Sequence, residues 1–443
     1  MYFAVVIAFC LSFVALSLQD SLPSFADVLS SQKNLSSFSD VLSKQYPDLL
    51  TRIGDQTSQN PITVLAPSNA AFAKTVYYPV IGPAFSQNDI GAIRAILEYH
   101  VVEGSHPSKS LLPTFQYFPT WLSNSSFTNV TNGQVVGGVM QSGTPPIMVW
   151  TSGQSNRSPV LSTDISFQGG TIHIIDSLLI PPTSFPATSE LFSTAAEPYQ
   201  LTSFLGATYY SPNTSLSPLA TLLNQSSDIT IFAPNNIAME SVSSTLTALS
   251  LTSNTSSAFQ DLLKYHIILS PTSSPWYSTL FPQNGSTLSL PTLGGETLTI
   301  SFSSNSFFVN SARILTSDLL LGNGVMHVLD NVLDEGKTDG KPNPSLATQV
   351  PVLSTGAVGG FNVSEAPFTT ALPNKVVTDA PVATGATFGA GGGGGGGGQA
   401  TGTGTGSAAG STGKAKSGGV RVRGKVDGGL GFMMICLLVL MVI

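Results

Sequence analysis

The sequence is nearly free of cysteine. Its 443 residues include only Cys10 and Cys436, and both lie in terminal segments that we expect to be removed, so the mature protein would contain none. This excludes thiol catalysis and cysteine-based zinc or iron–sulfur sites. Extracellular domains often depend on disulfides when their cores are small. The domains of this protein must instead depend on the burial of apolar side chains.

Charge is also scarce. Charged residues make up 9% of the chain, and the formal net charge is −7. The folded part contains no basic cluster, which excludes an ordinary nucleic-acid interface. Neither a phosphate-binding loop nor a Gly-X-Ser-X-Gly nucleophile motif after a strand is present. The surface is therefore predicted to be weakly charged and rich in hydroxyl groups.

The N-terminus carries an apolar run without charge, from Tyr2 to Leu18. This pattern predicts a signal peptide over residues 1–17, with Ala15-Leu16-Ser17 as the small-residue cleavage site. An uncleaved anchor is the alternative, because no Lys or Arg precedes the apolar run.

The C-terminus ends in a second apolar run, Leu430–Ile443, which is shorter than the ~20 residues that span a bilayer. A polar spacer precedes it, and the small residues Ser417-Gly418-Gly419 precede the spacer. This order predicts a GPI-attachment signal over residues 418–443, with Ser417 as the attachment residue. A short tail anchor or a disordered apolar end is the alternative.

Three segments occur twice, in the same order. Ile62–Phe72 matches Ile229–Met239, Ile96–Val102 matches Leu262–Ile268, and Gly170–Asp176 matches Gly324–Asp330. Repeats at this spacing indicate a duplicated domain, because solenoid repeats are far shorter. We therefore predict two domains, over residues 22–182 and 187–335, each large enough to hold its own core.

Each unit begins with helical periodicity and continues with short β-rich runs, which predicts an α+β fold. Asn88 is expected to cap a helix that carries Ile90, Ile93 and Leu97 on one face. The first unit is longer than the second around Trp121–Asn156, which predicts a glycosylated surface insertion.

Nine Asn-X-Ser/Thr sequons are present, and none lies inside the repeated apolar segments. Glycans require an exposed backbone, so this placement supports a secreted glycoprotein. The predicted N-glycosylation sites are Asn34, Asn124, Asn129, Asn156, Asn213, Asn224, Asn254, Asn284 and Asn362.

Beyond Glu335 the apolar periodicity stops. Residues 336–417 are rich in Pro, Thr, Ala and Gly and include eight glycines in a row, from Gly391 to Gly398. Such a composition cannot bury a core. It predicts a disordered stalk, with an end-to-end distance of roughly 50 Å for a flexible coil of this length.

The repeated segments resemble the signatures of fasciclin (FAS1) domains. Ile62–Phe72 resembles the first signature, Glu98-Tyr99-His100 the Tyr-His motif, and Val160–Ile165 with Gly170–Leu179 the second signature. The resemblance implies two compact domains, each a β-wedge flanked by helices, and a role in adhesion or in the extracellular matrix. It implies no catalysis and no cofactor.

In animal members of the family the Tyr-His region is connected with receptor-mediated adhesion. Because the Tyr-His motif occurs in both copies, the resemblance implies the same role for Tyr99, His100, Tyr265 and His266. The second copy departs from the family at Met239, where Phe is usual, and at Asn236-Ile237. These departures put a binding surface shared by both domains in doubt.

Four of the five histidines occupy repeated positions: His100 and His266, and His173 and His327. To bind zinc, these histidines would have to lie close to further ligands, because zinc binds three or four N, S or carboxylate groups. The sequence shows no such spacing and favours buried, hydrogen-bonded rings. Four aspartates lie near the ends of apolar strands: Asp164, Asp176, Asp318 and Asp330. Asp176 and Asp330 could catalyse glycoside hydrolysis only if they formed a pair of nearby carboxylates. An aspartate at a strand end more often accepts hydrogen bonds from the backbone.

The sequence thus predicts a non-enzymatic, GPI-anchored glycoprotein on the outer face of the plasma membrane or in the cell wall. Its tandem domains would mediate adhesion to a cell-surface or matrix protein, to a glycan, or to a second copy. Two alternatives remain. The domains could be inert spacers of a structural wall or stalk glycoprotein, or the protein could be a carbohydrate-binding module or a polysaccharide-active enzyme.

Overall fold

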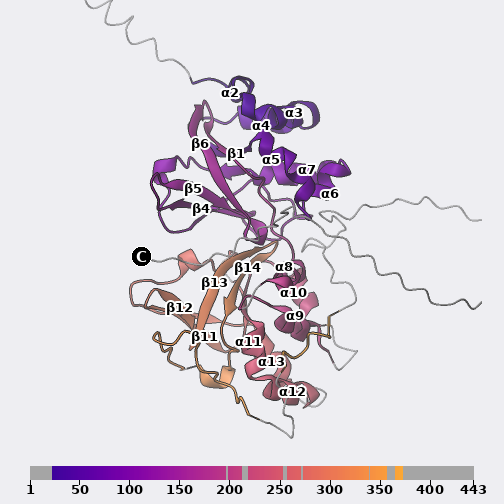
Figure 1. Cartoon of the computed structure of the whole chain (residues 1–443), viewed down its shortest axis with the longest axis vertical. Helices are drawn as coiled ribbons and strands as arrows, with labels where there is room; N and C mark the ends of the chain where they lie inside the picture. The colour runs from indigo at the N-terminus through magenta and orange to yellow at the C-terminus, as the bar shows by residue number, and fades with distance from the viewer. Residues whose placement is uncertain are drawn as a thin grey trace, which may run out of the picture. The chain divides into compact units, whose positions relative to one another are not determined.

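The computed structural model describes most of the sequence between residues 22 and 372. The described ranges are 22–195, 198–211, 218–252, 257–270, 273–338, 340–356 and 365–372. They belong to one compact unit that contains two domains of the same design (Figure 1). The expected signal peptide over 1–17, Ser417 and the segment 418–443 lie outside the described ranges. Within those ranges, no helix is long and apolar enough to cross a bilayer.

Short helices build one side of the first domain. They are α2 (Phe25–Ser31), α3 (Ser36–Gln45), α4 (Pro47–Gly54), α5 (Asn69–Ala73), α6 (Gly82–Ser86) and α7 (Ile90–Tyr99), with 3-10 turns η1 (Lys33–Leu35), η2 (Thr75–Tyr77), η3 (Ser108–Ser110) and η4 (Gly153–Ser155). Asp89 caps α7 and accepts a hydrogen bond from the Ala92 N–H at 3.0 Å. The prediction that Asn88 is the cap is wrong, because Asn88 has a left-handed backbone (φ 52°) and precedes the cap position.

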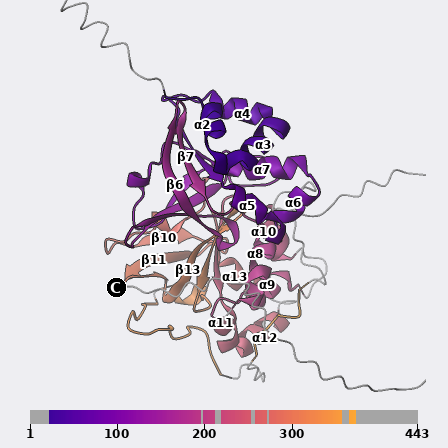
Figure 2. The same cartoon turned by 45° about the horizontal axis from the view of Figure 1, so that its top comes forward.

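A seven-stranded sheet forms the other side of this domain (Figure 2). Its strands are β1 (Ile62–Pro67), β2 (Val101–Glu103), β3 (Gln116–Pro119), β4 (Val135–Gln141), β5 (Ile147–Thr151), β6 (Arg157–Phe167) and β7 (Gly170–Ile175), in the order β2-β1-β7-β6-β5-β4-β3. Strands β1 and β7 pair in parallel, from Ile62 opposite Gly170 to Pro67 opposite Ile175. The first and third repeated segments therefore lie side by side.

The second domain repeats this plan. Its helices are α8 (Phe185–Leu191), α9 (Thr202–Tyr209), α10 (Leu219–Gln225), α11 (Asn236–Ser241), α12 (Ser243–Thr252) and α13 (Ala258–Lys264), with 3-10 turns η5 (Phe192–Thr194), η6 (Ser278–Leu280) and η7 (Glu335–Lys337). Its strands are β8 (Ile229–Pro234), β9 (Ile267–Leu269), β10 (Leu288–Pro291), β11 (Thr297–Ser303), β12 (Ser306–Val309), β13 (Ala312–Leu321) and β14 (Gly324–Leu329). They form the sheet β10-β11-β12-β13-β14-β8-β9, in which β8 and β14 pair in parallel.

Large aromatic side chains are fully buried in both cores, among more numerous aliphatic ones. Side chains with less than 2% exposure include Phe25, Phe38, Tyr46, Trp150 and Phe167 in the first domain and Phe185, Phe204, Phe232, Phe259 and Phe308 in the second. Each contributes roughly 1.5–3 kcal/mol by leaving water. The fully buried Phe185 shows that the second core begins before the predicted boundary at residue 187. The predicted α+β class is confirmed.

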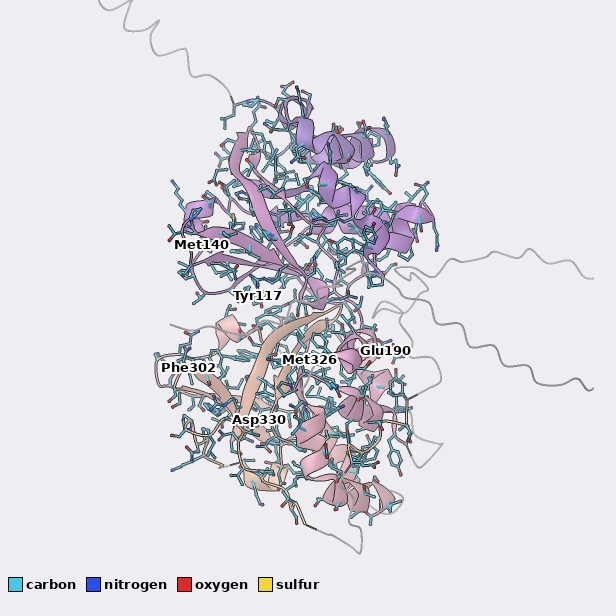
Figure 3. All side chains as sticks on the ribbon, in the orientation of Figure 1. Tyr117, Met140, Glu190, Phe302, Met326 and Asp330 are labelled. Atoms are coloured by element: carbon cyan, nitrogen blue, oxygen red, sulfur yellow. The ribbon has the colours of Figure 1, made fainter. Side chains whose placement is uncertain are left out.

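The segment after the second domain differs from the expected stalk. Residues 340–356 and 365–372, which we call the C-terminal strap, pack against the second domain through Leu353, Phe368 and Leu372. Asp330 lies at the end of β14 (Figure 3). Its carboxylate accepts the Gln349 N–H at 2.8 Å. The prediction of disorder from residue 336 is thus wrong for the strap. A few apolar residues anchor it, without the periodicity of a helix or strand.

Candidate functional site

The two tyrosines of the Tyr-His motif occupy equivalent places. Tyr99 ends α7 and donates its hydroxyl proton to the Val135 carbonyl at the start of β4, at 2.7 Å. Tyr265 follows α13 and donates to the Thr297 carbonyl at the start of β11, at 2.9 Å. Each hydroxyl thus joins a helix to the sheet of its own domain, and both side chains are fully buried.

The adjacent histidines are fully buried as well. The Leu179 N–H donates to Nε2 of His100 at 2.9 Å, so the ring proton is on Nδ1, which donates to the Ile96 carbonyl at 2.7 Å. His266 repeats this with the Leu333 N–H and the Leu262 carbonyl. Burial lowers the pKa of both rings to about 4, so they are neutral at pH 7.

None of these four side chains is accessible to a partner in the folded domains. The expectation of buried, hydrogen-bonded histidines is confirmed for His100 and His266. A role of the four residues in adhesion stays a prediction. Any such role would have to act through the backbone and neighbouring surface that they support.

The second histidine pair uses the opposite tautomer. Nδ1 of His173 accepts the Asp164 N–H at 3.2 Å, and its Nε2 then carries the proton and donates to the His106 carbonyl at 2.9 Å. His327 is held in the same way by the Asp318 N–H and the Trp276 carbonyl. Burial again lowers the pKa of both rings.

The two aspartates in these contacts lie at irregularities of β6 and β13, where the strand register shifts. Both have left-handed backbones, with φ of 61°. The Asp164 carboxylate accepts the backbone N–H of Ser108 at 2.8 Å and also its hydroxyl. Asp318 accepts the same two groups of Ser278. Burial raises the pKa of Asp164, but the hydrogen bonds from Ser108 outweigh it and hold that pKa below its usual value.

Serine, aspartate and histidine meet here, but not in the order that nucleophilic catalysis requires. A serine nucleophile needs a base that receives its proton. The Ser108 hydroxyl instead bonds to Asp164, and both nitrogens of His173 are bound to backbone groups. Across the described ranges, no three His, Cys, Asp or Glu side chains gather closely enough to hold a metal ion. The arrangement braces loops against the sheet.

Asp176 and Asp330 follow equivalent strands in different domains and so do not form a carboxylate pair. Asp330 is 4% exposed, and its carboxylate accepts the Arg313 and Gln349 N–H groups at 2.7 and 2.8 Å. Asp176 accepts the hydroxyl of Ser177 at 2.5 Å. These are the backbone and local hydrogen bonds typical of structural aspartates.

The extra length of the first domain turns out to contact the second domain. Residues 120–134 connect β3 to β4, whereas the equivalent β10–β11 connection spans only residues 292–296. We call residues 120–134 the docking loop. Part of the expected surface insertion is therefore a contact element, whereas Asn124, Thr131 and Asn132 within it are exposed.

Asp228, just before β8, receives the docking loop. Its carboxylate accepts the Thr131 N–H at 2.9 Å and the Thr131 hydroxyl, and Asp228 is 3% exposed. Backbone carbonyls of the second domain also accept hydrogen bonds from the docking loop. The Gly322 carbonyl accepts from the Thr128 hydroxyl and the Asn129 N–H, and the Leu321 carbonyl accepts from the Gln134 side chain. The Gln225 and Ser273 carbonyls accept from the side chains of Asn129 and Asn132, respectively. Sequence reasoning missed these residues. The unequal lengths of the two β3–β4-type connections were the available signal.

Apolar contacts continue this surface. The rings of Tyr117 and Tyr277 stack with centroids 5.0 Å apart, and Val135, Leu320 and Val325 pack with them. A cavity of about 220 Å³ lies beside the stacked rings. It is smaller than the ~300–1,000 Å³ of typical small-molecule sites. We therefore interpret this region as a domain–domain contact.

The sequons divide into two structural groups. Asn34, Asn124 and Asn284 are exposed, whereas Asn129, Asn156 and Asn224 are half-buried. The amide nitrogen of Asn129 donates to the Gln225 carbonyl at 3.2 Å, and that of Asn156 donates to the Leu178 carbonyl at 3.0 Å. Asn213, Asn254 and Asn362 lie outside the described ranges. Glycosylation at all nine stays a prediction.

The Fasciclin domain family matches residues 33–181 and 210–335. A fasciclin-like arabinogalactan protein of Arthroderma benhamiae is 30% identical over 316 residues, which cover 71% of this chain and 68% of that protein. Fasciclin-like arabinogalactan protein elcF of Phaeosphaeria nodorum is 23% identical over 293 residues, covering 64% and 81%. The CTB11 protein of the same kind from Cercospora beticola is 29% identical over 251 residues, covering 55% and 60%.

The solved FAS1 domain pair of the insect cell adhesion molecule Fasciclin I is also similar. It is 18% identical with a TM-score of 0.32, and the match covers 69% of this chain and 98% of that one. At this TM-score the likeness adds nothing to the assignment. The fungal relatives place the protein among cell-surface or cell-wall glycoproteins, and fasciclin domains are a non-enzymatic kind of domain. Because the family matches more than half of the sequence, this chain belongs to the fasciclin domain family.

Proposed function

We propose that this protein is a non-enzymatic, GPI-anchored glycoprotein whose two fasciclin domains act together as one adhesive unit at the cell surface or wall. The observation that carries this proposal is the contact between the docking loop and Asp228. Inert spacers would not need a hydrogen-bonded contact between them that buries Asp228. A paired unit presents its surface in one fixed arrangement, which reduces the entropy lost when a partner binds.

Exposed side chains would make the contact with the partner, because the Tyr-His pairs are buried. Among the residues that the structure describes, the two most exposed large apolar ones are adjacent, Val76 at 75% and Tyr77 at 82%, and both lie in η2. Exposed aromatic residues are enriched among those that anchor protein interfaces. We therefore propose this turn as the first site at which to test contact with the partner. The partner would be a cell-surface or matrix protein, a glycan, or a second copy of the protein.

Cells that display the full-length protein would test this proposal in three assays: self-aggregation, adhesion to wall polymers, and adhesion to matrix proteins. We expect Tyr77→Ser to reduce adhesion at unchanged surface level. Tyr99→Phe is the matched control, since it removes a buried hydroxyl and leaves the surface intact. Adhesion no greater than that of cells lacking the protein would instead favour the structural wall or stalk glycoprotein with inert domains.

The lipid anchor needs a separate measurement. We expect a phosphatidylinositol-specific phospholipase to release the protein from intact cells, and Ser417 to carry the anchor. Full retention after this treatment would overturn the anchor without affecting adhesion. The carbohydrate-binding or polysaccharide-active alternative would be revived by turnover or binding that is lost in Asp176→Asn or Asp330→Asn. The hydrogen bonds that Asp176 and Asp330 accept from Ser177 and from backbone N–H groups argue against this alternative.

A further inference from the structure

The C-terminal strap covers a face of the second domain formed by α9, Tyr210 and α13, which we call the groove. Phe368 lies against the rings of Tyr210 and Phe259, with centroids 5.2 and 5.1 Å away. The Ser203 hydroxyl donates to the Pro367 carbonyl at 2.6 Å. The groove therefore contacts both an aromatic side chain and the backbone of a Pro-Phe segment, which forms a turn closed by the Ala371 N–H and the Phe368 carbonyl.

Gly206 in α9 makes this approach possible. A Cβ atom at residue 206 would lie 2.0 Å from the Phe368 carbonyl oxygen and 2.8 Å from its carbonyl carbon. Any side chain at this position would displace the strap. The backbone of Phe368 is also left-handed, with φ of 64°, which a bulky residue adopts only where its surroundings hold it.

The equivalent surface of the first domain is charged and unsuited to such a segment. The Ser37 N–H donates to the Asn69 side chain as the Ser203 N–H donates to that of Asn236, which aligns α3 with α9. On this alignment Asp40 stands in place of Gly206 and Lys44 in place of Tyr210. Asp40 and Lys44 form an exposed ion pair at 3.0 Å. Among the described residues, the groove is thus a feature of the second domain.

A second set of contacts leads the strap to the groove. Gln349 is bound by Asp330 and Asn331, and the Ser354 carbonyl accepts the Thr245 hydroxyl at 2.8 Å. The Arg313 guanidinium donates to the Pro344 and Leu346 carbonyls at 3.0 and 2.7 Å. Residues 340–356 are therefore held along the second domain before residues 365–372 reach α9 and α13.

We propose that the face formed by α9, Tyr210 and α13 is a peptide-binding site for a Pro-Phe turn, and that residues 365–372 occupy it as a tethered ligand. The last described residues thus end in this groove rather than at the end of β14. The site is independent of the adhesive role proposed above. Its recognition rests on an aromatic anchor, one hydroxyl donor and a glycine that admits the ligand backbone.

The test uses the full-length protein and a fluorescent peptide with the sequence of residues 365–372. We expect no binding of the peptide to the native protein, because the groove is filled. Phe368→Ala should empty the groove and allow binding in trans. Adding Gly206→Ala to Phe368→Ala should abolish that binding, as should replacing Phe by Ala in the peptide. Exchange of the segment between two copies, seen as a dimer, would also support the site.

Hydrogen exchange provides the second readout. In Gly206→Ala, amides of residues 365–372 should exchange at least about tenfold faster than in the native protein, with β1 unchanged. Alanine is a better helix former than glycine, so weakening of α9 cannot explain such a loss. Asp40→Ala in the first domain is the matched control. Unchanged protection in Gly206→Ala, or no peptide binding by a folded Phe368→Ala protein, would overturn the proposal.

Discussion

The carboxylate of Asp228 in the second domain receives both the backbone N–H and the hydroxyl of Thr131 in the first. The same two-bond pattern holds a serine to an aspartate inside each domain, Ser108 to Asp164 and Ser278 to Asp318. One hydrogen-bonding device thus fixes loops within the domains and also fixes one domain to the other.

Replacing Asp228 should uncouple the domains. In Asp228→Ala the Thr131 N–H and hydroxyl would lose their charged acceptor, at a cost of about 1–3 kcal/mol. We expect calorimetry to show two separated unfolding transitions where the native protein shows one coupled transition. Asp40→Ala is the control, since Asp40 is exposed and forms an ion pair with Lys44 inside the first domain. A single transition at the native temperature in Asp228→Ala would show that the contact contributes nothing to coupling.

Stability should fall as the pH falls from about 6.5 to 4. The folded-state pKa of His100 and of His266 is lowered to about 4 by burial, whereas an unfolded histidine titrates near 6.5. Below pH 6.5 the unfolded state therefore binds protons that the folded state does not. Each histidine should cost about 1.4 kcal/mol of unfolding free energy per pH unit across this window.

Denaturant unfolding at pH 7, 5.5 and 4.5 would measure this loss. The pKa values of His106, His173 and His327 are lowered too and act in the same direction. Burial raises the pKa of Glu98 and Asp330, which opposes the trend only near the acid end of the window. Unfolding free energies that do not change between pH 7 and 4.5 would contradict neutral, buried rings.

The parallel pairing of β8 and β14 should depend on glycine at residue 324. A Cβ atom there would lie 2.0 Å from the Ile229 carbonyl oxygen, and backbone cannot move aside as a flexible side chain can. We expect Gly324→Ala to destabilise the second domain by about 4 kcal/mol or to prevent its folding. Gly54→Ala is the matched control, because nothing lies within 4 Å of its added methyl group. Equal melting temperatures for the two variants would refute the close approach.

Glycan occupancy should follow exposure for the sequons that the structure describes. Asn284→Gln should remove the mass of one glycan from the secreted protein and leave its stability unchanged, because Asn284 is exposed. Asn156→Gln should cost about 1 kcal/mol whether or not a glycan is present, since the Asn156 amide bonds the Leu178 carbonyl. Intact mass and thermal unfolding of both variants would test this. Unaltered mass in Asn284→Gln would show that exposure does not decide occupancy.

Much of the fold could be predicted because the same three sequence segments occur twice, in the same order. The repeated segments became β1 and β8, the ends of α7 and α13, and β7 and β14, at equivalent positions in both sheets. The paired histidines could be assigned to buried hydrogen bonds because a metal site needs convergent ligands. Their opposite tautomers could not be predicted, since these depend on which backbone groups reach each ring nitrogen.

The errors came at one helix start and in one segment that distant residues stabilise. Asn88 and Asp89 are both good cap residues, and the backbone conformation of Asn88 decided between them. The strap has the composition of a disordered segment. It is nevertheless ordered, because Phe368 packs closely on Gly206 and the Gln349 N–H donates to the Asp330 carboxylate. No local pattern in residues 336–372 reports on a groove formed by α9 and α13.

By itself, the sequence determined that this is a duplicated α+β protein with only two cysteines and few charges, because periodicity, turn residues and repetition can be read directly from the order of the residues. Only the tertiary structure decided that Tyr99 and Tyr265 are buried, that Thr131 meets Asp228, and that Phe368 returns to Gly206. Those outcomes depend on contacts between residues tens to hundreds of positions apart. Burial and hydrogen bonding there are set by the packing of whole elements, which no local pattern records.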